Sequence, residues 1–122
     1  MQQVVPALRI RSHEASSVFY AKLGFKEQWR HQFEAGLPVF ASVARDGMEM
    51  FHTEHVGDCQ FGALMHFYEL DVDECYSQFR QRGVLIEKPP SNSLGPELRD
   101  MLVVDPDVNR LSFLTCSAET AK

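Results

Sequence analysis

The sequence has few cysteines, no Cys-x-x-Cys pair and no long hydrophobic run, and these absences exclude several classes of protein. Its three cysteines, Cys59, Cys75 and Cys116, are odd in number and widely spaced. Such a set disfavours a disulfide-stabilised fold and a structural zinc site, and it favours a reducing compartment. No apolar run approaches the roughly 20 residues that cross a bilayer, and Met1–Arg11 lacks the layout of a signal peptide. We therefore expect a cytoplasmic protein with no membrane partner.

Excess positive charge and the common catalytic motifs are also missing. The net charge of −5 disfavours nucleic acid as a partner. There is no Gly-x-Ser-x-Gly motif and no glycine-rich phosphate-binding loop. We interpret Asp71, Asp73 and Glu74 as helix-cap and first-turn charges rather than catalytic carboxylates. Cys75 fits a buried, inert thiol better than a nucleophile.

What the sequence does contain is a pattern that occurs twice. Val4–Ile10 is apolar and β-branched, which predicts a buried strand, and Ser12 then caps a helix that ends at Gly24. Adding 59 to the numbers of Ser12 and Gly24 gives Asp71 and Gly83, which bound a second helix after a second apolar strand, Ala63–Leu70. At 122 residues the chain has the length of one domain, and we expect a single domain over residues 1–122.

Each predicted helix has a candidate core face. Asp71 and Glu74 form an Asp-x-x-Glu capping box at the start of the second helix. Helical spacing predicts that the buried residues are Ala15, Val18, Phe19 and Leu23 in the first helix, and Cys75 and Phe79 in the second.

A hairpin follows each helix and extends the correspondence. Asp46-Gly47 is a strong two-residue turn signal, and Asp105, 59 positions later, begins a turn about two residues longer. The polar stretch Thr53–Gly62 is the predicted joint. We therefore predict an α+β fold of two βαβββ modules in one chain, at about residues 1–55 and 60–122.

Two such modules, with "FYAKLGF" at Phe19–Phe25 and "DPDVNRL" at Asp105–Leu111, resemble the vicinal oxygen chelate superfamily. This superfamily includes glyoxalase I, extradiol dioxygenases and the fosfomycin- and bleomycin-resistance proteins. The short chain and the aromatic Trp29 are most similar to the bleomycin-resistance branch. The resemblance implies a curled mixed sheet and a homodimer with ligand grooves at the interface, in which the chains often exchange their first strand.

The resemblance also implies four strand positions where metal-dependent members place His, Gln or Glu ligands. Aligned from the helices and the repeat, these positions fall on Val5, Phe51, Leu64 and Ser112. Apolar side chains do not coordinate a cation, and one neutral serine is a poor donor. We therefore expect no metal and no other cofactor.

A small error in strand register leaves an alternative open. His66 shares a face with Leu64 and Glu49 shares a face with Phe51, whereas His52 should point the other way unless a bulge intervenes. Convergence of His66 with Glu49 or His52 would restore a metal-dependent lyase, transferase or dioxygenase. We interpret His13 and His31 as surface residues and place His55 in the linker.

The aromatic residues supply the candidate ligand site. In bleomycin-resistance proteins an aromatic residue at the position of Trp29 stacks on the planar rings of the ligand, and Phe33 and Phe40 follow it by position. Strand parity adds Phe51, His66 and Tyr68. Met50 and Met65 are candidates for an adaptable apolar wall. Further candidates are three carboxylates for a cationic ligand, namely Glu34, Glu49 and Glu69, and a rim loop at Lys88–Met101.

The favoured function is a non-catalytic homodimer that sequesters an aromatic, cationic small molecule such as a bleomycin-like antibiotic. The first alternative is a metal-dependent enzyme of the same superfamily. The second is a protein-interaction module that uses its cup as a docking surface.

Overall fold

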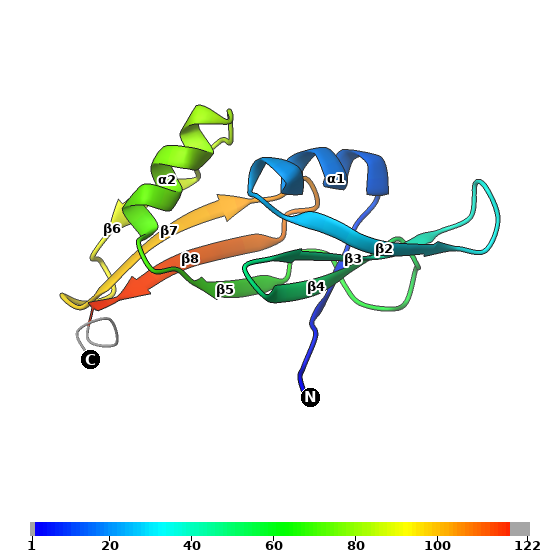
Figure 1. Cartoon of the computed structure of the whole chain (residues 1–122), viewed down its shortest axis with the longest axis horizontal. Helices are drawn as coiled ribbons and strands as arrows, with labels where there is room; N and C mark the ends of the chain where they lie inside the picture. The colour runs from blue at the N-terminus through cyan, green and yellow to red at the C-terminus, as the bar shows by residue number, and fades with distance from the viewer. Residues whose placement is uncertain (1, 118–122) are drawn as a thin grey trace. The chain divides into compact units, whose positions relative to one another are not determined.

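The structure, a computed structural model, describes residues 2–117 of the chain. In chain order its elements are β1 (Ala7–Arg9), α1 (His13–Lys22), β2 (Lys26–Gln32), β3 (Val39–Arg45), β4 (Met48–Thr53), β5 (Leu64–Tyr68), α2 (Val72–Gln81), β6 (Lys88–Ser91), β7 (Leu98–Val104) and β8 (Arg110–Cys116). A strand, a helix and three strands thus occur twice, which confirms the predicted α+β fold with a duplicated βαβββ module (Figure 1).

The strands form two four-stranded mixed sheets, one for each module, with strand orders β1-β4-β3-β2 and β5-β8-β7-β6. In each sheet the first strand pairs in parallel with the last, and the other neighbours are antiparallel. The chain divides into two compact units, which we describe separately. The first runs to Ala63 and includes Pro106–Val108, and the second holds Leu64–Asp105 and the chain from Asn109 onward.

The pairing register shows how closely the modules correspond. Ala7 pairs with Phe51 across β1 and β4, and His66 pairs with Ser112 across β5 and β8. His66 lies 59 positions after Ala7, whereas Ser112 lies 61 positions after Phe51. The predicted offset is therefore confirmed, with two additional residues in the second hairpin turn.

Both helices begin and end where the sequence predicts. Ser12 Oγ accepts a hydrogen bond from a first-turn N–H of α1 at 3.2 Å, and the Asp71 carboxylate accepts two from the first turn of α2 at 3.1 and 3.2 Å. Gly24 and Gly83 follow the helices with φ of 93° and 81°, a conformation that glycine adopts without steric cost. Among residues 2–117, no helix combines the length and apolar character needed to cross a membrane.

The predicted core face of α1 is mostly wrong. Leu23 is buried as predicted, but Ala15 and Val18 are exposed, Phe19 is only half-buried, and the predicted surface residue His13 is buried. The helix residues that are buried are His13, Ser16 and Tyr20.

Polar contacts explain why hydropathy missed this face. His13 Nε2 lies 2.8 Å from Glu27 Oε1 on β2. Ser16 Oγ lies 3.5 Å from Nδ1 of His52 on β4, and the His52 ring stacks at 4.4 Å on Tyr20. A carboxylate beside His13 and a hydroxyl beside His52 offset part of the cost of burying these polar side chains. The residues therefore occupy a core face that a search for apolar side chains does not find.

The predicted core face of α2 is confirmed. Cys75 and Phe79 are buried, and Phe79 packs edge-on against Phe113 of β8 with ring centroids 5.1 Å apart. Phe113 in turn stacks on Phe67 of β5 at 4.8 Å. Of the predicted capping box, the Asp71 half is present, while the Glu74 carboxylate accepts from Gln78 Nε2 at 3.3 Å.

The two hairpin turns match their sequence signals. Asp46 and Gly47 both have positive φ, 51° and 79°, and Arg45 pairs with Met48, as in a type I′ hairpin. In the second turn the Asp105 carboxylate accepts from the backbone and side-chain amides of Asn109 at 2.9 and 3.0 Å. These bonds hold the longer turn closed.

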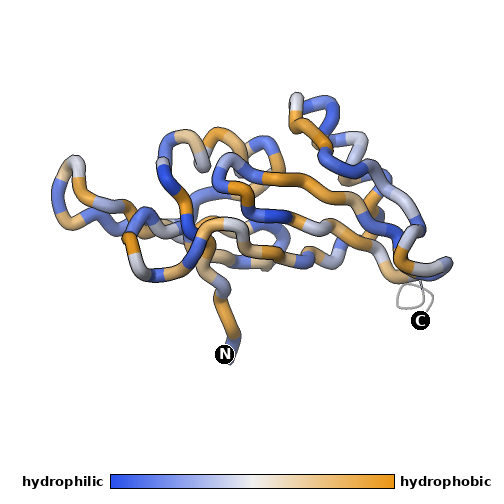
Figure 2. Tube along the Cα trace, turned by 180° about the vertical axis from the view of Figure 1, so that it is seen from behind, coloured by the Kyte–Doolittle hydropathy of each residue, from blue (hydrophilic) through white to orange (hydrophobic). Residues whose placement is uncertain are grey.

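The segment Lys88–Met101 is not one loop, contrary to the prediction. Lys88–Ser91 forms β6, despite its two prolines, and β7 begins at Leu98. Because β6 is the edge of its sheet, a proline there need not supply a ladder N–H. In Figure 2 the tube is mainly hydrophilic in the connection that leads into β7 and mainly hydrophobic along the second half of β7.

Candidate ligand-binding face

The first unit has one sheet face covered by α1 and an opposite face, which we call the first open face. Tyr20 of α1 contacts His52, so His52 points toward the helix and its neighbour Phe51 points away. His52 therefore faces as predicted. The residues paired with Phe51 lie on the same face, namely Ala7 on β1 and Ser42 on β3.

Three predicted ligand-binding residues gather on the first open face. Phe51 lies 5.5 Å from Trp29 and 5.1 Å from Phe40, measured between ring centroids, and Trp29 stacks on Phe40 at 6.0 Å with 17° between the rings. We call these three residues the aromatic triad. Trp29 is 44% exposed and the two phenylalanines are half-buried. The rings therefore leave apolar surface open to solvent.

A β-bulge in β2 brings Trp29 onto this face. Glu27 pairs with Val43 and Trp29 pairs with the adjacent Ser42, so Gln28 is an extra residue in the strand. Glu27 faces α1, where it contacts His13, and strict alternation would turn Trp29 toward α1 as well. The inserted residue re-aims Trp29 toward the open face, a known effect of bulges.

A carboxylate lies beside the triad. Ser42, between Trp29 and Phe51 in the pairing, donates its hydroxyl hydrogen to Glu49 Oε2 at 2.5 Å. The Gln28 side-chain oxygen lies 3.0 Å from the same hydroxyl, and Gln3 Nε2 lies 3.5 Å from Glu49 Oε1. Flat aromatic surface next to a carboxylate suits a planar ligand that carries a positive charge.

The other predicted ligand residues lie elsewhere. Phe33 is in the β2–β3 connection and is 79% exposed, so no strand aligns it with the triad. Glu34 is in the same connection. His66 and Tyr68 belong to β5 of the second unit, where Phe67 faces α2 through Phe113, so both point to the face away from α2, the second open face.

Strand pairing shows how the four expected metal positions lie relative to one another. Phe51 pairs with Ala7 and Ser112 pairs with His66, so Val5 and Leu64 each lie two residues before the paired residue. Val5 precedes β1 altogether. Among the four expected positions and these two pairing partners, only His66 is a good ligand, and no group of three or more His, Cys, Asp or Glu side chains within residues 2–117 is placed to hold a metal ion. The residues present do not fit the superfamily's metal.

The thiol of Cys59, in the first unit, has a raised pKa. Partial burial raises the pKa of Cys59, and the neighbouring Asp58 carboxylate raises it further, while Arg9 lowers it. At neutral pH this cysteine is therefore a protonated thiol and a weak nucleophile.

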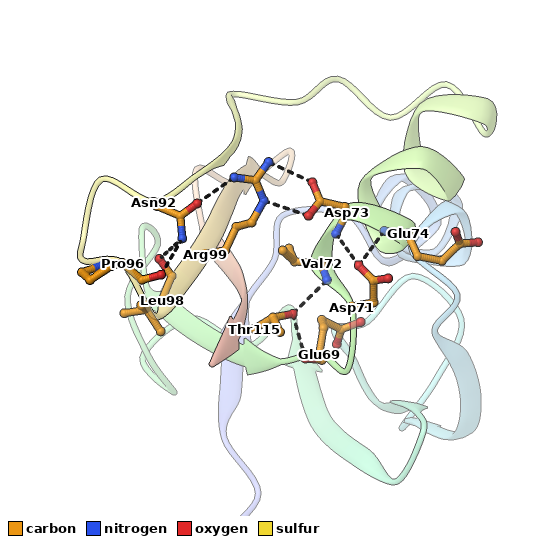
Figure 3. A network of polar contacts seen from close by, with 10 residues as sticks. All are labelled: Glu69, Asp71, Val72, Asp73, Glu74, Asn92, Pro96, Leu98, Arg99 and Thr115. Carbon is orange, nitrogen blue, oxygen red and sulfur yellow. Dashed lines mark hydrogen bonds and ion pairs between the residues drawn. The ribbon is translucent and has the colours of Figure 1, made fainter. Parts of the chain in front are cut away.

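A polar network on the second unit has a structural role (Figure 3). Arg99 makes two hydrogen bonds to Asp73, at 2.8 and 3.0 Å, and a third to Asn92 Oδ1 at 2.9 Å. The bonds to Asp73 raise the pKa of Arg99. Thr115 Oγ1 accepts from the Val72 N–H and donates to the Glu69 carbonyl. These bonds join the start of α2 to β7 and β8 beside a hollow of about 340 Å³.

Sequence reasoning missed Gln28 and Ser42, since neither the bulge nor the hydroxyl between the rings has a signature in the sequence. It also missed Asp100, a buried charge on β7. A lone acid inside the apolar run "LRDMLVV" was the available signal.

Comparisons with known proteins agree with this fold. A family model described as glyoxalase superfamily protein matches residues 1–119. A bleomycin resistance determinant encoded on transposon Tn5 is 22% identical, with a TM-score of 0.74 over 95% of this chain and 98% of that chain. A bleomycin-binding protein complexed with bleomycin is 23% identical, with a TM-score of 0.71 over 94% and 98%. A glyoxalase/bleomycin resistance protein from Catenulispora acidiphila is 18% identical, with a TM-score of 0.72 over 94% and 98%. No curated protein gives a significant sequence match.

Proposed function

This chain belongs to the glyoxalase superfamily, and from that premise we propose that it binds and sequesters a planar, cationic small molecule without transforming it. The observation that carries the proposal is the aromatic triad beside Glu49. Three rings with centroids 5.1–6.0 Å apart present half-exposed apolar surface, and a carboxylate lies within the same sheet face.

The ligand class follows from the chemistry of this face. Stacking on an aromatic ring contributes about 0.5–1.5 kcal/mol beyond area burial, and a cation over a ring adds about 0.5–2 kcal/mol. Bleomycin is both cationic and aromatic, and one structural neighbour is a bleomycin-binding protein. We therefore propose bleomycin-like antibiotics as the first ligands to test, and drug resistance as the biological role.

Residue chemistry disfavours the enzymatic alternative. Activation of oxygen or stabilisation of an enediolate in this superfamily uses a divalent ion. The paired strand residues Ala7, Phe51 and Ser112 supply no strong metal ligand to accompany His66. Elemental analysis of protein reloaded with Ni²⁺, Zn²⁺, Mn²⁺ or Fe²⁺ tests this point. One tightly bound ion per chain would favour the metal-dependent enzyme instead.

We further propose that a second copy of the chain completes the groove, because one open sheet face covers a ligand on one side only. The three cysteines form no disulfide within residues 2–117, which suits the reducing cytoplasm as the working compartment. Light scattering of purified protein measures the assembly state, and a monomer at micromolar concentration would contradict the dimer.

Trp29 is the only tryptophan, so its fluorescence reports directly on the proposed face. Titration with bleomycin should change its emission with saturation at one site per chain. Trp29→Phe should remove the signal but retain binding heat in calorimetry, and Glu49→Gln should weaken binding of the cation. Neither an emission change nor heat across a panel of planar cations would refute the proposal.

A further inference from the structure

Asp100 is a buried carboxylate without a partner in the described chain. It is 7% exposed, and its Oδ1 atom is fully buried with no hydrogen bond. The two other buried aspartates each hold a polar group. Asp105 accepts from Asn109, and Asp107 accepts from the Arg11 backbone N–H at 3.1 Å.

The register places Asp100 on the second open face. Its neighbour Met101 pairs with Phe113, which packs on α2, so Met101 faces the helix and Asp100 faces away. Asp100 pairs with Leu114 on β8 and Ser91 on β6, and Leu114 pairs with Tyr68 on β5. The carboxylate thus lies in one row across the sheet with an apolar side chain and a 61% exposed aromatic ring.

The chain's own nearby cations are engaged elsewhere. Arg99 points to the α2 side of the sheet and holds Asp73 and Asn92 (Figure 3). Lys88 Nζ donates to Ser93 Oγ at 2.8 Å. No ion pair joins Asp100 to any residue from 2 to 117. A buried carboxylate with no counter-charge is costly to fold, and the cost is relieved when a cation arrives from outside.

We propose that Asp100 is the anionic end of a cation-binding site on the second open face, with Tyr68 as its aromatic wall. The site takes an amidinium, guanidinium or ammonium group attached to a planar ring. The proposal rests on the proposed binding function and extends it to a residue and a sheet face that the aromatic triad does not include. Leu98 and Leu102 flank the carboxylate and are half-buried, and the proposed site requires that one of them change rotamer to admit the ligand.

Benzamidine and its neutral analogue benzamide form a matched pair of probes. Chemical shifts of the full chain should change on titration with benzamidine at the amides of Asp100, Leu114 and Tyr68. Asp100→Asn should weaken benzamidine binding at least tenfold and leave the weaker benzamide binding unchanged. Glu49→Gln, the matched charge removal on the first open face, should leave the shifts around Asp100 unchanged.

The melting temperature supplies a second, ligand-free measurement. Asp100→Asn removes the unpaired charge and should melt at or above the temperature of the original chain. A large drop, or failure to fold, would mean that the carboxylate has an essential partner within the protein and would overturn the proposal.

Other outcomes separate this site from the proposed function. Unchanged benzamidine affinity in Asp100→Asn, or no benzamidine shifts near Asp100, would refute the Asp100 site. Trp29 quenching by bleomycin in the same protein would then still support the first open face. The opposite result would refute the triad site instead: bleomycin would not quench Trp29, while benzamidine would still change the chemical shifts near Asp100.

Discussion

Replacing Phe51 with alanine is the sharpest test of the aromatic triad. Phe51 contacts both other rings, at 5.5 and 5.1 Å, whereas Trp29 and Phe40 are 6.0 Å apart. The substitution removes two of the three ring pairs and keeps the fluorescent reporter. Its effect on Trp29 emission, on stability and on binding can therefore be measured in one variant.

The magnitudes follow from burial and ring contacts. Phe51 is half-buried, so its loss should cost about 1–2 kcal/mol of folding free energy, less than the roughly 3–5 kcal/mol of a fully buried phenylalanine. Ring pairs contribute about 0.5–1.5 kcal/mol each, and a ligand seated on the triad loses contacts of the same size. We expect the Kd for a planar cation to rise about 3–10-fold, since a ligand loses its contact with one ring and a tenfold change is about 1.4 kcal/mol.

Fluorescence titration and urea unfolding check the two effects separately. Trp29 emission in the free Phe51→Ala protein should shift to the red as its apolar neighbour disappears. Val18→Ala is the control, because Val18 is 60% exposed on α1, away from the open face. A folded Phe51→Ala protein with unchanged emission and a Kd within twofold of the original would refute the triad as a ligand surface.

Three further predictions concern packing, capping and thiol chemistry. Phe79→Ala should lower the free energy of unfolding by about 3–5 kcal/mol, because Phe79 is fully buried against Phe113; a loss below 1 kcal/mol in urea unfolding would contradict this packing. Asp71→Ala should cost about 1 kcal/mol, since the carboxylate caps two N–H groups of α2, and circular dichroism on heating would show an unshifted transition if the cap were unimportant. Asp58→Asn should speed alkylation of Cys59 at pH 8, because removing the negative charge lowers the thiol pKa and raises the thiolate fraction; peptide mass spectrometry with iodoacetamide would expose a wrong sign as an unchanged or slower rate.

The repeated architecture could be predicted because its signals are local. A cap such as Ser12 or a turn such as Asp46-Gly47 depends on a few neighbouring residues, and each is found where the sequence predicts it. The α2 core face was also visible, because it consists of apolar residues at helical spacing. These features need no knowledge of which strands pair.

The failed predictions depend on contacts between distant residues. The α1 face is buried through His13 and Ser16, whose partners Glu27 and His52 lie outside the helix, 14 and 36 residues farther along the chain. Counting back from a helix likewise does not fix strand register. Pairing shows Ala7, not Val5, level with Phe51.

The bulge at Gln28 shows how such long-range geometry determines the candidate site. A one-residue change in strand phase exchanges the two faces of a sheet. Without the extra residue, Trp29 would follow Glu27 toward α1, and its indole would compete for space with His13 and Tyr20. With it, Glu27 still reaches His13 while Trp29 joins Phe40 and Phe51 on the open face. The same strand therefore supplies a core ion pair on the face covered by α1 and an aromatic side chain on the opposite face. One face of the sheet can thus pack on the helix while the other remains available to a ligand.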